Sequence, residues 1–133
     1  MTKNYKMQYH KFIFEGKIAA SGNIQYLLED SGSRVDVPAS AYYSLFQDCD
    51  SLVSAPELPA TTLDYNCYEN MFLGCTSLTQ APALPATTLA NSCYANMFSG
   101  CTKFSDCHMK AEMQGVYDTS THGDTTKTVI YDL

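Results

Sequence analysis

A repeated stretch decides the fold: AYYSLFQDCDSLVSAPELPATTL, from Ala41 to Leu63, returns as CYENMFLGCTSLTQAPALPATTL, from Cys67 to Leu89. A third, shorter copy, CYANMFSGCTKF, begins at Cys93, so the three segments superpose at a spacing of 26 residues. In the first two copies the run Ala-Pro-x-Leu-Pro-Ala-Thr-Thr-Leu changes only at x. A fixed internal period of this length is typical of architectures in which repeated units stack on one another.

Each copy predicts a short helix followed by an extended return. In the second copy four apolar residues fall at positions i, i+1, i+4 and i+5, which is one face of a helix. They are Cys67, Tyr68, Met71 and Phe72. Gly74 can supply the left-handed residue that ends such a helix, and Pro82 holds the segment before it, residues 76–81, extended. A single unit has too little area to bury this face, so we expect neighbouring copies to stack and equivalent residues to form ladders.

We expect two structural ladders at the centre of the stack. They are Phe46, Phe72 and Phe98, and Cys49, Cys75 and Cys101. Because the period also relates Cys67 to Cys93, it accounts for five of the six cysteines as small buried side chains, which favours free thiols. A disulfide between Cys67 and Cys93 stays open as the best candidate bridge, since stacked units lie close together while the sequence leaves the side-chain directions undefined.

The motif MFxGCTSLTxAPxLPATTLAxxCYxxMF, residues 71–98, resembles the repeat unit of BspA-like leucine-rich-repeat proteins, which are surface proteins of gut anaerobes and also occur in their phages. The resemblance covers residues 41–104, and residues 22–28 are similar to the segment that often leads into these repeats. It implies a leucine-rich-repeat solenoid that acts in adhesion or molecular recognition. The family has no active site, so the resemblance implies no catalytic residues.

Period and resemblance together predict an α+β repeat fold, a short leucine-rich-repeat-like solenoid of about three 26-residue repeats with β hairpins capping both ends. All 133 residues are expected to form one compact domain. Its parts are an N-terminal β cap (1–38), the repeat solenoid (39–104) and a C-terminal cap (105–133).

The two caps are expected to be β hairpins that cover the open ends of the stack. Between residues 6 and 24, alternating apolar residues predict two strands. These residues are Tyr9, Phe12, Phe14 and Ile18. In the C-terminal cap, residues 116–118 and 127–131 are strand-like on either side of a polar stretch. An exposed hairpin edge can pair with another copy of the chain, so the caps are the expected places for an oligomer contact.

Charge and hydropathy exclude several classes of partner. The net charge is −6, and no lysine or arginine occurs between Arg34 and Lys103. Affinity for nucleic acid comes from clustered cations, so this acidic middle disfavours DNA or RNA binding. No run reaches the roughly 18 apolar residues of a membrane helix, and the N-terminus lacks the apolar core of a signal peptide. We therefore expect no membrane insertion and thiols in the reduced state.

No group of residues predicts catalysis, a metal site or a cofactor. Cys101, Cys107 and His108 are close in sequence but lack the CxxC or HxxxH spacing of structural zinc sites. A nucleophilic cysteine needs a lowered pKa beside a base, and no motif specifies that arrangement. Calcium-loop and phosphate-loop spacings are also absent from the sequence. We expect a non-enzymatic protein.

A possible binding surface is expected where the copies differ, because these positions should face solvent. Such positions are Glu57, Asp64, Glu69 and Leu73. The recurrent tyrosines Tyr42, Tyr68 and Tyr94 have two interpretations: a binding stripe of large side chains, or rings that cover the core and expose only their hydroxyls. The second interpretation is favoured.

The expected function is that of a structural or recognition module displayed on a surface. The first hypothesis is a structural or decoration protein of a bacteriophage virion, with self-association or other particle proteins as partners. A virion protein leaves the cell by lysis and needs no secretion signal. The alternative is a bacterial cell-surface or secreted adhesin that binds a host protein or glycan, which the family resemblance favours.

Overall fold

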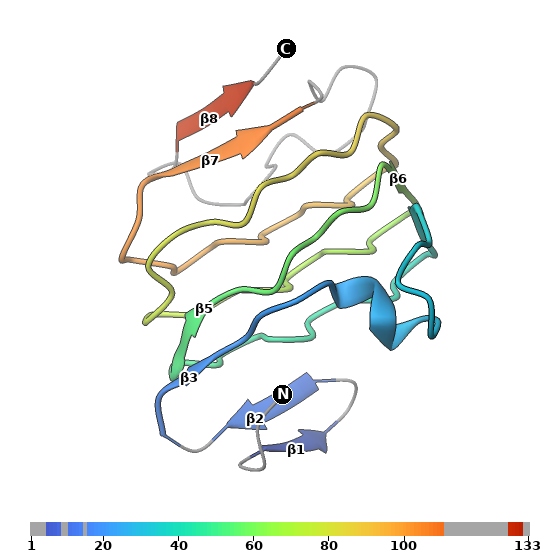
Figure 1. The fold of residues 1–133 in the computed structure, drawn as a ribbon. Helices are drawn as coiled ribbons and strands as arrows, with labels where there is room; N and C mark the ends of the chain where they lie inside the picture. Colours follow the sequence, from blue (N-terminus) through green and yellow to red (C-terminus); the bar gives the residue numbers. More distant parts are fainter. Residues whose placement is uncertain (1–4, 9–10, 15, 111–127, 132–133) are drawn as a thin grey trace.

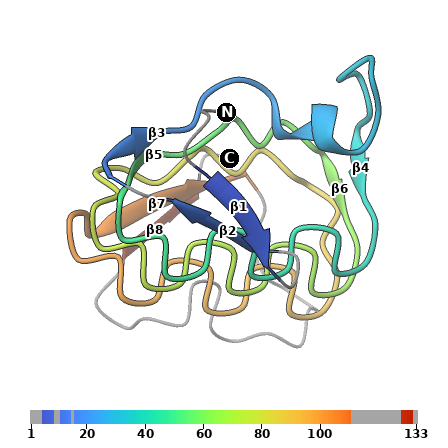
Figure 2. The same ribbon diagram turned by 90° about the horizontal axis from the view of Figure 1, so that it is seen from below.

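The chain winds into stacked coils in a computed structural model that describes residues 5–8, 11–14, 16–110 and 128–131 (Figure 1). Each coil contains a zigzag segment, which we call a turn row, and an extended return segment. The turn rows are residues 40–48, 66–74 and 92–100, and the return segments are residues 52–63 and 78–89. Seen from below, successive coils superpose (Figure 2).

Among the described residues, short strands pair in four two-stranded sheets, three of them parallel. The parallel pairs are β3 (Ile18–Ala19) with β5 (Leu52–Ser54), β4 (Asp36–Val37) with β6 (Thr62–Leu63), and β7 (Asp106–Met109) with β8 (Thr128–Tyr131). The antiparallel pair is β1 (Tyr5–Gln8) with β2 (Lys11–Phe14). Parallel pairing fits a coiled path, because each coil passes its neighbour in the same direction.

Two alternating sets of backbone hydrogen bonds hold the turn rows together. Within a row, every second N–H donates to the carbonyl three residues earlier, as Leu45 does to Tyr42 at 3.2 Å. The N–H groups in between donate to the following row, as Phe46 does to Met71 at 2.9 Å. The second row bonds to the third in the same way. Each row is therefore a series of turns that also pairs with its neighbour as a strand does in a parallel sheet.

The predicted helices are wrong, and with them the α+β, leucine-rich-repeat-like solenoid class. Within the described ranges the single helical element is the 3-10 helix η1 (Ile24–Leu27), and the rest is short strands and turns. The physical reason lies in left-handed backbone at every fourth residue of the turn rows, which an α-helix does not tolerate. These residues are Ser40, Ser44, Asp48, Asn66, Asn70, Gly74, Ser92, Asn96 and Gly100. A turn that repeats every four residues gives the same i, i+4 apolar spacing as a helix.

The hairpin predicted at the C-terminal cap, between residues 116–118 and 127–131, is not tested, although its second strand is found with another partner. Strand β8 pairs in parallel with β7, so these two strands do not form a hairpin. The strand predicted at residues 116–118 lies outside the described residues. At the N-terminal end β1 and β2 form an antiparallel hairpin, with Tyr5 opposite Phe14, whereas the prediction continued the hairpin to Ile18. Ile18 instead belongs to β3, because its N–H donates to the Ser51 carbonyl of the coil above at 2.9 Å.

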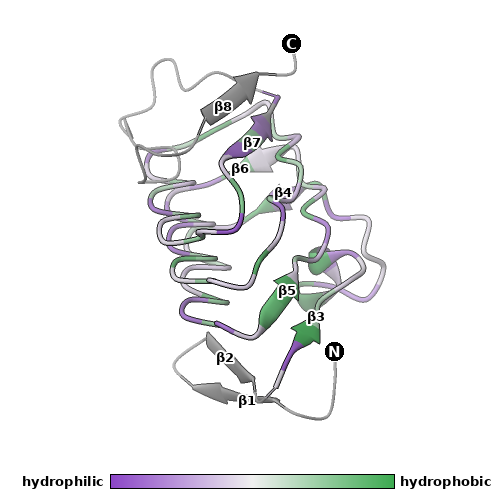
Figure 3. Ribbon diagram, turned by 90° about the vertical axis from the view of Figure 1, so that its left-hand side faces the viewer, coloured by the Kyte–Doolittle hydropathy of each residue, from purple (hydrophilic) through white to green (hydrophobic). Residues whose placement is uncertain are grey.

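The core is built from columns of identical side chains. Phe72 lies between Phe46 and Phe98, with ring centroids 5.5 and 5.8 Å apart and the rings within 8° of parallel. A second column stacks Tyr68 between Tyr42 and Tyr94 at 5.9 Å on each side. These distances lie in the range of favourable aromatic contacts. Along the turn rows, hydrophobic and hydrophilic residues alternate, which places one set in the core and the other outside (Figure 3).

Gly74, which ends the second turn row, and Gly22, which lies outside the rows, allow a matched test of how closely neighbouring rows pack. Gly74 has φ +76°, and an added methyl group would run into the Asp48 side chain of the row below. Gly22 has φ +83° with nothing within 4 Å of that position. We expect Gly22→Ala to cost about 1 kcal/mol from left-handed strain alone, and Gly74→Ala about 1 to 2 kcal/mol because the exposed Asp48 carboxylate must also move aside, both measured by urea denaturation. Equal costs would show that the Asp48 side chain moves aside freely.

Candidate interaction surface

The four positions singled out because the copies differ there are not equally exposed. Glu57 and Asp64 are exposed, whereas Glu69 and Leu73 are half-buried. The Glu69 carboxylate accepts a hydrogen bond from the side-chain amide of Asn66 in its own turn row, which fixes part of its orientation. Glu57 and Asp64 are therefore the two of these four side chains that are most available to a partner.

The recurrent tyrosines are buried and do not form an exposed stripe. Tyr42, Tyr68 and Tyr94 are 2%, 1% and 0% exposed. The Tyr42 hydroxyl donates to the side-chain oxygen of Gln25 at 2.8 Å. Among the described residues, the hydroxyls of Tyr68 and Tyr94 have no hydrogen-bond partner. Burial raises the pKa of all three phenols well above the ordinary value.

Gln25 is a buried polar residue that sequence reasoning missed. Its side-chain N–H groups donate to the carbonyls of Arg34 and Asp36 at 2.8 and 3.0 Å, while its oxygen accepts from Tyr42. These bonds tie η1 to the loop before β4, to β4 itself and to the first turn row. Its neighbours in sequence are apolar, so only the tertiary position shows that a glutamine is needed here.

The tyrosine column supports a paired prediction about buried hydroxyl groups. We expect Tyr42→Phe to destabilise the protein by about 1 to 2 kcal/mol, because the buried Gln25 oxygen loses its donor. Tyr68→Phe should be neutral or stabilising by up to about 1 kcal/mol, since it removes a buried hydroxyl without a partner in the described structure. Thermal unfolding of both variants makes the comparison. A larger loss for Tyr68→Phe than for Tyr42→Phe would contradict it.

All six cysteines are buried free thiols. The Cys75 thiol donates to the Phe46 carbonyl at 3.0 Å, and the Cys101 thiol donates to the Phe72 carbonyl at 3.1 Å. Burial raises the pKa of the Cys67 and Cys75 thiols. A thiol that stays protonated is a poor nucleophile and a poor metal ligand, so this chemistry fits a packing role. Cys67 and Cys93 are not bridged.

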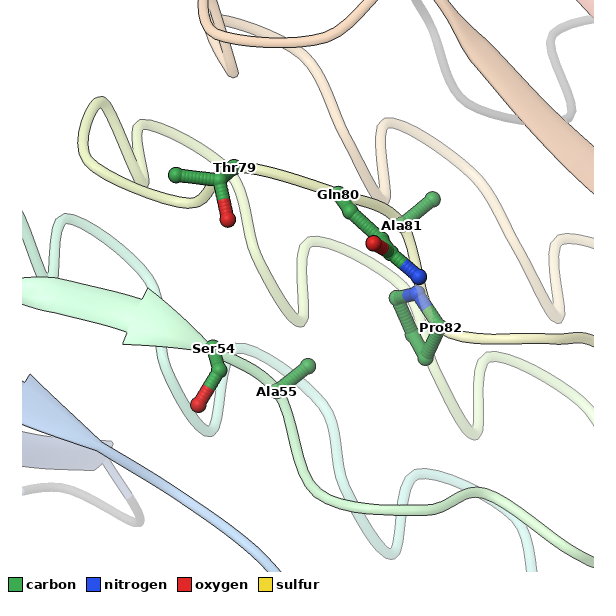
Figure 4. A pocket seen from close by; sticks show the side chains of 6 residues that line it. All are labelled: Ser54, Ala55, Thr79, Gln80, Ala81 and Pro82. Atoms are coloured by element: carbon green, nitrogen blue, oxygen red, sulfur yellow. The ribbon is translucent and has the colours of Figure 1, made fainter.

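Shallow hollows line the face formed by η1 and the return segments. One, of about 260 Å³, lies between Ser54 and Ala55 of one coil and residues 79–82 of the next (Figure 4). A second, of about 300 Å³, is lined mainly by prolines and by Glu57. A third, of about 260 Å³, is lined by Tyr26 and Leu27, which are 59% and 51% exposed. The first two hollows lie between the same pair of return segments and share Ala55 and Pro82 in their linings.

Only part of this face was predicted from the sequence. Glu57 was singled out because it differs between copies, whereas Tyr26 and Leu27 were expected only to belong to the segment that leads into the repeats. The structure places them in η1, where a 3-10 turn directs both side chains toward solvent. Exposed apolar side chains beside a hollow are typical of contact surfaces.

The sequence matches no family model, no curated protein and no solved structure.

In the described part of the chain, no group of three or more histidine, cysteine, aspartate or glutamate side chains is placed to hold a metal ion. Among the same residues, no helix is long and apolar enough to cross a membrane. The candidate interaction surface is the face of η1 and the return segments, because the hollows and the exposed Tyr26 and Leu27 lie there.

Proposed function

We propose that the protein is a non-enzymatic structural or recognition module displayed on a surface, and specifically a structural or decoration protein of a bacteriophage virion. Its partners are other copies of the chain or other particle proteins. The proposal rests on how the repeats divide between core and surface, together with the resemblance of the repeat unit, residues 71–98, to repeats that also occur in phage proteins.

The observation that carries the proposal is that the tyrosines, phenylalanines and cysteines shared by the three copies are buried, while several positions that differ between copies are exposed. The shared phenylalanines are fully buried, whereas Glu57 and its equivalent Ala83 are both exposed. A scaffold of this kind tolerates substitutions at exposed positions without disturbing the columns of buried side chains. Such an arrangement is typical of proteins that present a surface to a partner.

The test is to follow the protein in purified particles. In a culture that produces both the chain and phage, we expect its peptides to co-sediment with particles through a density gradient at a constant ratio to the major capsid protein. Mass spectrometry of the fractions measures that ratio. Protease treatment of intact, washed cells is the companion measurement. Peptides released from cells but absent from particles would overturn the virion proposal in favour of the adhesin.

A further inference from the structure

The two return segments are hydrogen-bonded to each other near their ends and separate between them. The Thr79 N–H donates to the Val53 carbonyl at 3.3 Å, and the Thr87 N–H donates to the Thr61 carbonyl at 3.0 Å. Between these two bonds, no backbone hydrogen bond joins one described segment to the other. The first two hollows lie in this gap (Figure 4). Prolines favour it because they lack an N–H donor, and they are Pro56, Pro59, Pro82 and Pro85.

Backbone groups on both sides of the gap are left without partners. The N–H and carbonyl of Glu57 both bond to the coil below, and those of Leu84 both bond to β7 and the residue that follows it. In an extended segment, adjoining residues direct their backbone groups to opposite sides, which turns those of Leu58 and Ala83 toward the gap. In the described structure, neither the N–H nor the carbonyl of Leu58 or Ala83 has a hydrogen-bond partner. Both residues line the hollow of about 300 Å³.

The three hollows form one continuous surface that carries a single charge. The second and third hollows share Pro56, just as the first two share Ala55 and Pro82. Among the residues that line them, Glu57 alone is charged at neutral pH. Its side chain is exposed, and its carboxylate has no hydrogen-bond or ion-pair partner among the described residues. The surface therefore presents one unpaired negative charge among mostly apolar side chains.

We infer that this face binds an extended peptide segment of another protein, with its main chain along Leu58 and Ala83 and a lysine or arginine opposite Glu57. The main chain of an extended peptide supplies the donors and acceptors that unpaired backbone groups require. The unpaired carboxylate is complementary to a cation. The inference deepens the proposed recognition role, on which it rests, by naming the chemistry of the partner.

Other occupants fit this face less well. A helical segment satisfies its backbone groups internally, so it would leave those of Leu58 and Ala83 without partners. An acidic segment or a nucleic acid would bring negative charge to Glu57, and no lysine or arginine occurs between Arg34 and Lys103 to attract it. An extended basic segment meets both requirements.

Selection from a random decapeptide library on beads tests the inference. The purified full chain is labelled and incubated with the beads, and the selected peptides are remade and titrated by fluorescence anisotropy. We expect the selected peptides to share one lysine or arginine. Glu57→Gln should weaken their binding about two- to fivefold, the range for an exposed charge pair. The matched control is Asp64→Asn, which alters an exposed carboxylate that lines none of the three hollows and should leave binding unchanged.

Two further measurements separate main-chain binding from simple charge attraction. Replacing single peptide N–H groups by N-methyl groups should weaken binding about two- to tenfold at one position or more, because each replacement removes one main-chain donor. Ala83→Lys places a cation in the gap and should weaken binding more than about tenfold, while the exposed position leaves the fold intact.

Three results would overturn the inference. The first is that no selected peptide has a Kd below about 100 µM. The second is that selected peptides lack a cation or respond equally to Glu57→Gln and Asp64→Asn. The third is that N-methylation has no effect at any position, which would indicate a helical or side-chain-only contact.

The result is independent of the particle experiment. Peptide selection uses the purified full chain, so it can fail while the protein still co-sediments with particles through another contact. Conversely, selective binding of basic peptides by a protein found only on cells would support this face as the binding site and reject the virion proposal.

Discussion

Replacing Phe72 with alanine is expected to destabilise the protein by about 3 to 5 kcal/mol, the range for truncating a large aromatic side chain in a packed core. Phe72 is fully buried and its ring contacts Phe46 below and Phe98 above. The substitution removes both stacking contacts and leaves a cavity in the middle of the column, where neighbouring rows are too firmly hydrogen-bonded to close it. Chemical denaturation followed by near-ultraviolet circular dichroism measures the loss.

Two variants sharpen this prediction. Phe72→Leu keeps most of the volume and should cost less, because the cavity is smaller even though the ring contacts are lost. Tyr65→Ala removes an exposed ring and should change the free energy of unfolding by no more than about 0.5 kcal/mol. A loss of under about 1 kcal/mol for Phe72→Ala would mean that the column contributes little to the fold.

Alkaline pH is expected to unfold the protein cooperatively, because several acidic groups are held protonated in its core. Burial raises the pKa of Cys67 and Cys75 above the ordinary 9.0, and that of Tyr42, Tyr68 and Tyr94 above the ordinary 10.0. Above these ordinary values the unfolded chain loses protons that the folded protein retains. The free energy of unfolding is therefore unaffected by these groups below about pH 8 and falls as pH rises above 9.

The expected effect is large because the groups act together. Each contributes a loss of about 1.4 kcal/mol per pH unit once its unfolded form ionises, so two thiols remove about 3 kcal/mol per unit above pH 9 and all five about 7 above pH 10. Against a typical total stability of about 5 to 15 kcal/mol, the protein should unfold within roughly two pH units of pH 9. Circular dichroism measures the loss of the fold, and tyrosinate absorbance measures the ionisation of the phenols.

The decisive observation is whether circular dichroism and tyrosinate absorbance change at the same pH. Absorbance from the buried phenols should rise in the same narrow pH range in which circular dichroism is lost. Tyr68→Phe removes one of the titrating groups and should move the midpoint to higher pH, whereas Tyr65→Phe alters an exposed ring and should leave it in place. A native spectrum that persists at pH 12 would contradict the prediction.

The repeat alone was enough to identify which residues occupy equivalent places. A period of 26 residues places Phe46, Phe72 and Phe98 in register, and the structure stacks these rings. The reason is local: a unit too small to bury its own apolar face must bury it against the next copy. The backbone conformation that achieves this did not follow from the period.

The helices were mispredicted because the same apolar pattern fits two different backbone conformations. A spacing of i, i+4 suits both an α-helix and a row of turns with a four-residue period. A signal that distinguishes them was present in the sequence, since every left-handed position in the turn rows is serine, asparagine, aspartate or glycine, and all of these except serine tolerate this backbone well. In an α-helix, polar side chains at every fourth position would have had no such role.

The sequence by itself thus determined the repeat, the columns and the acidic character of the middle of the chain. Only the tertiary structure decided where the backbone hydrogen bonds go: half of the N–H groups in a turn row bond within it, and the others bond to the following row. That division depends on a neighbouring row being present, which no single segment encodes. For the same reason, only the structure reveals Gln25 as a buried anchor.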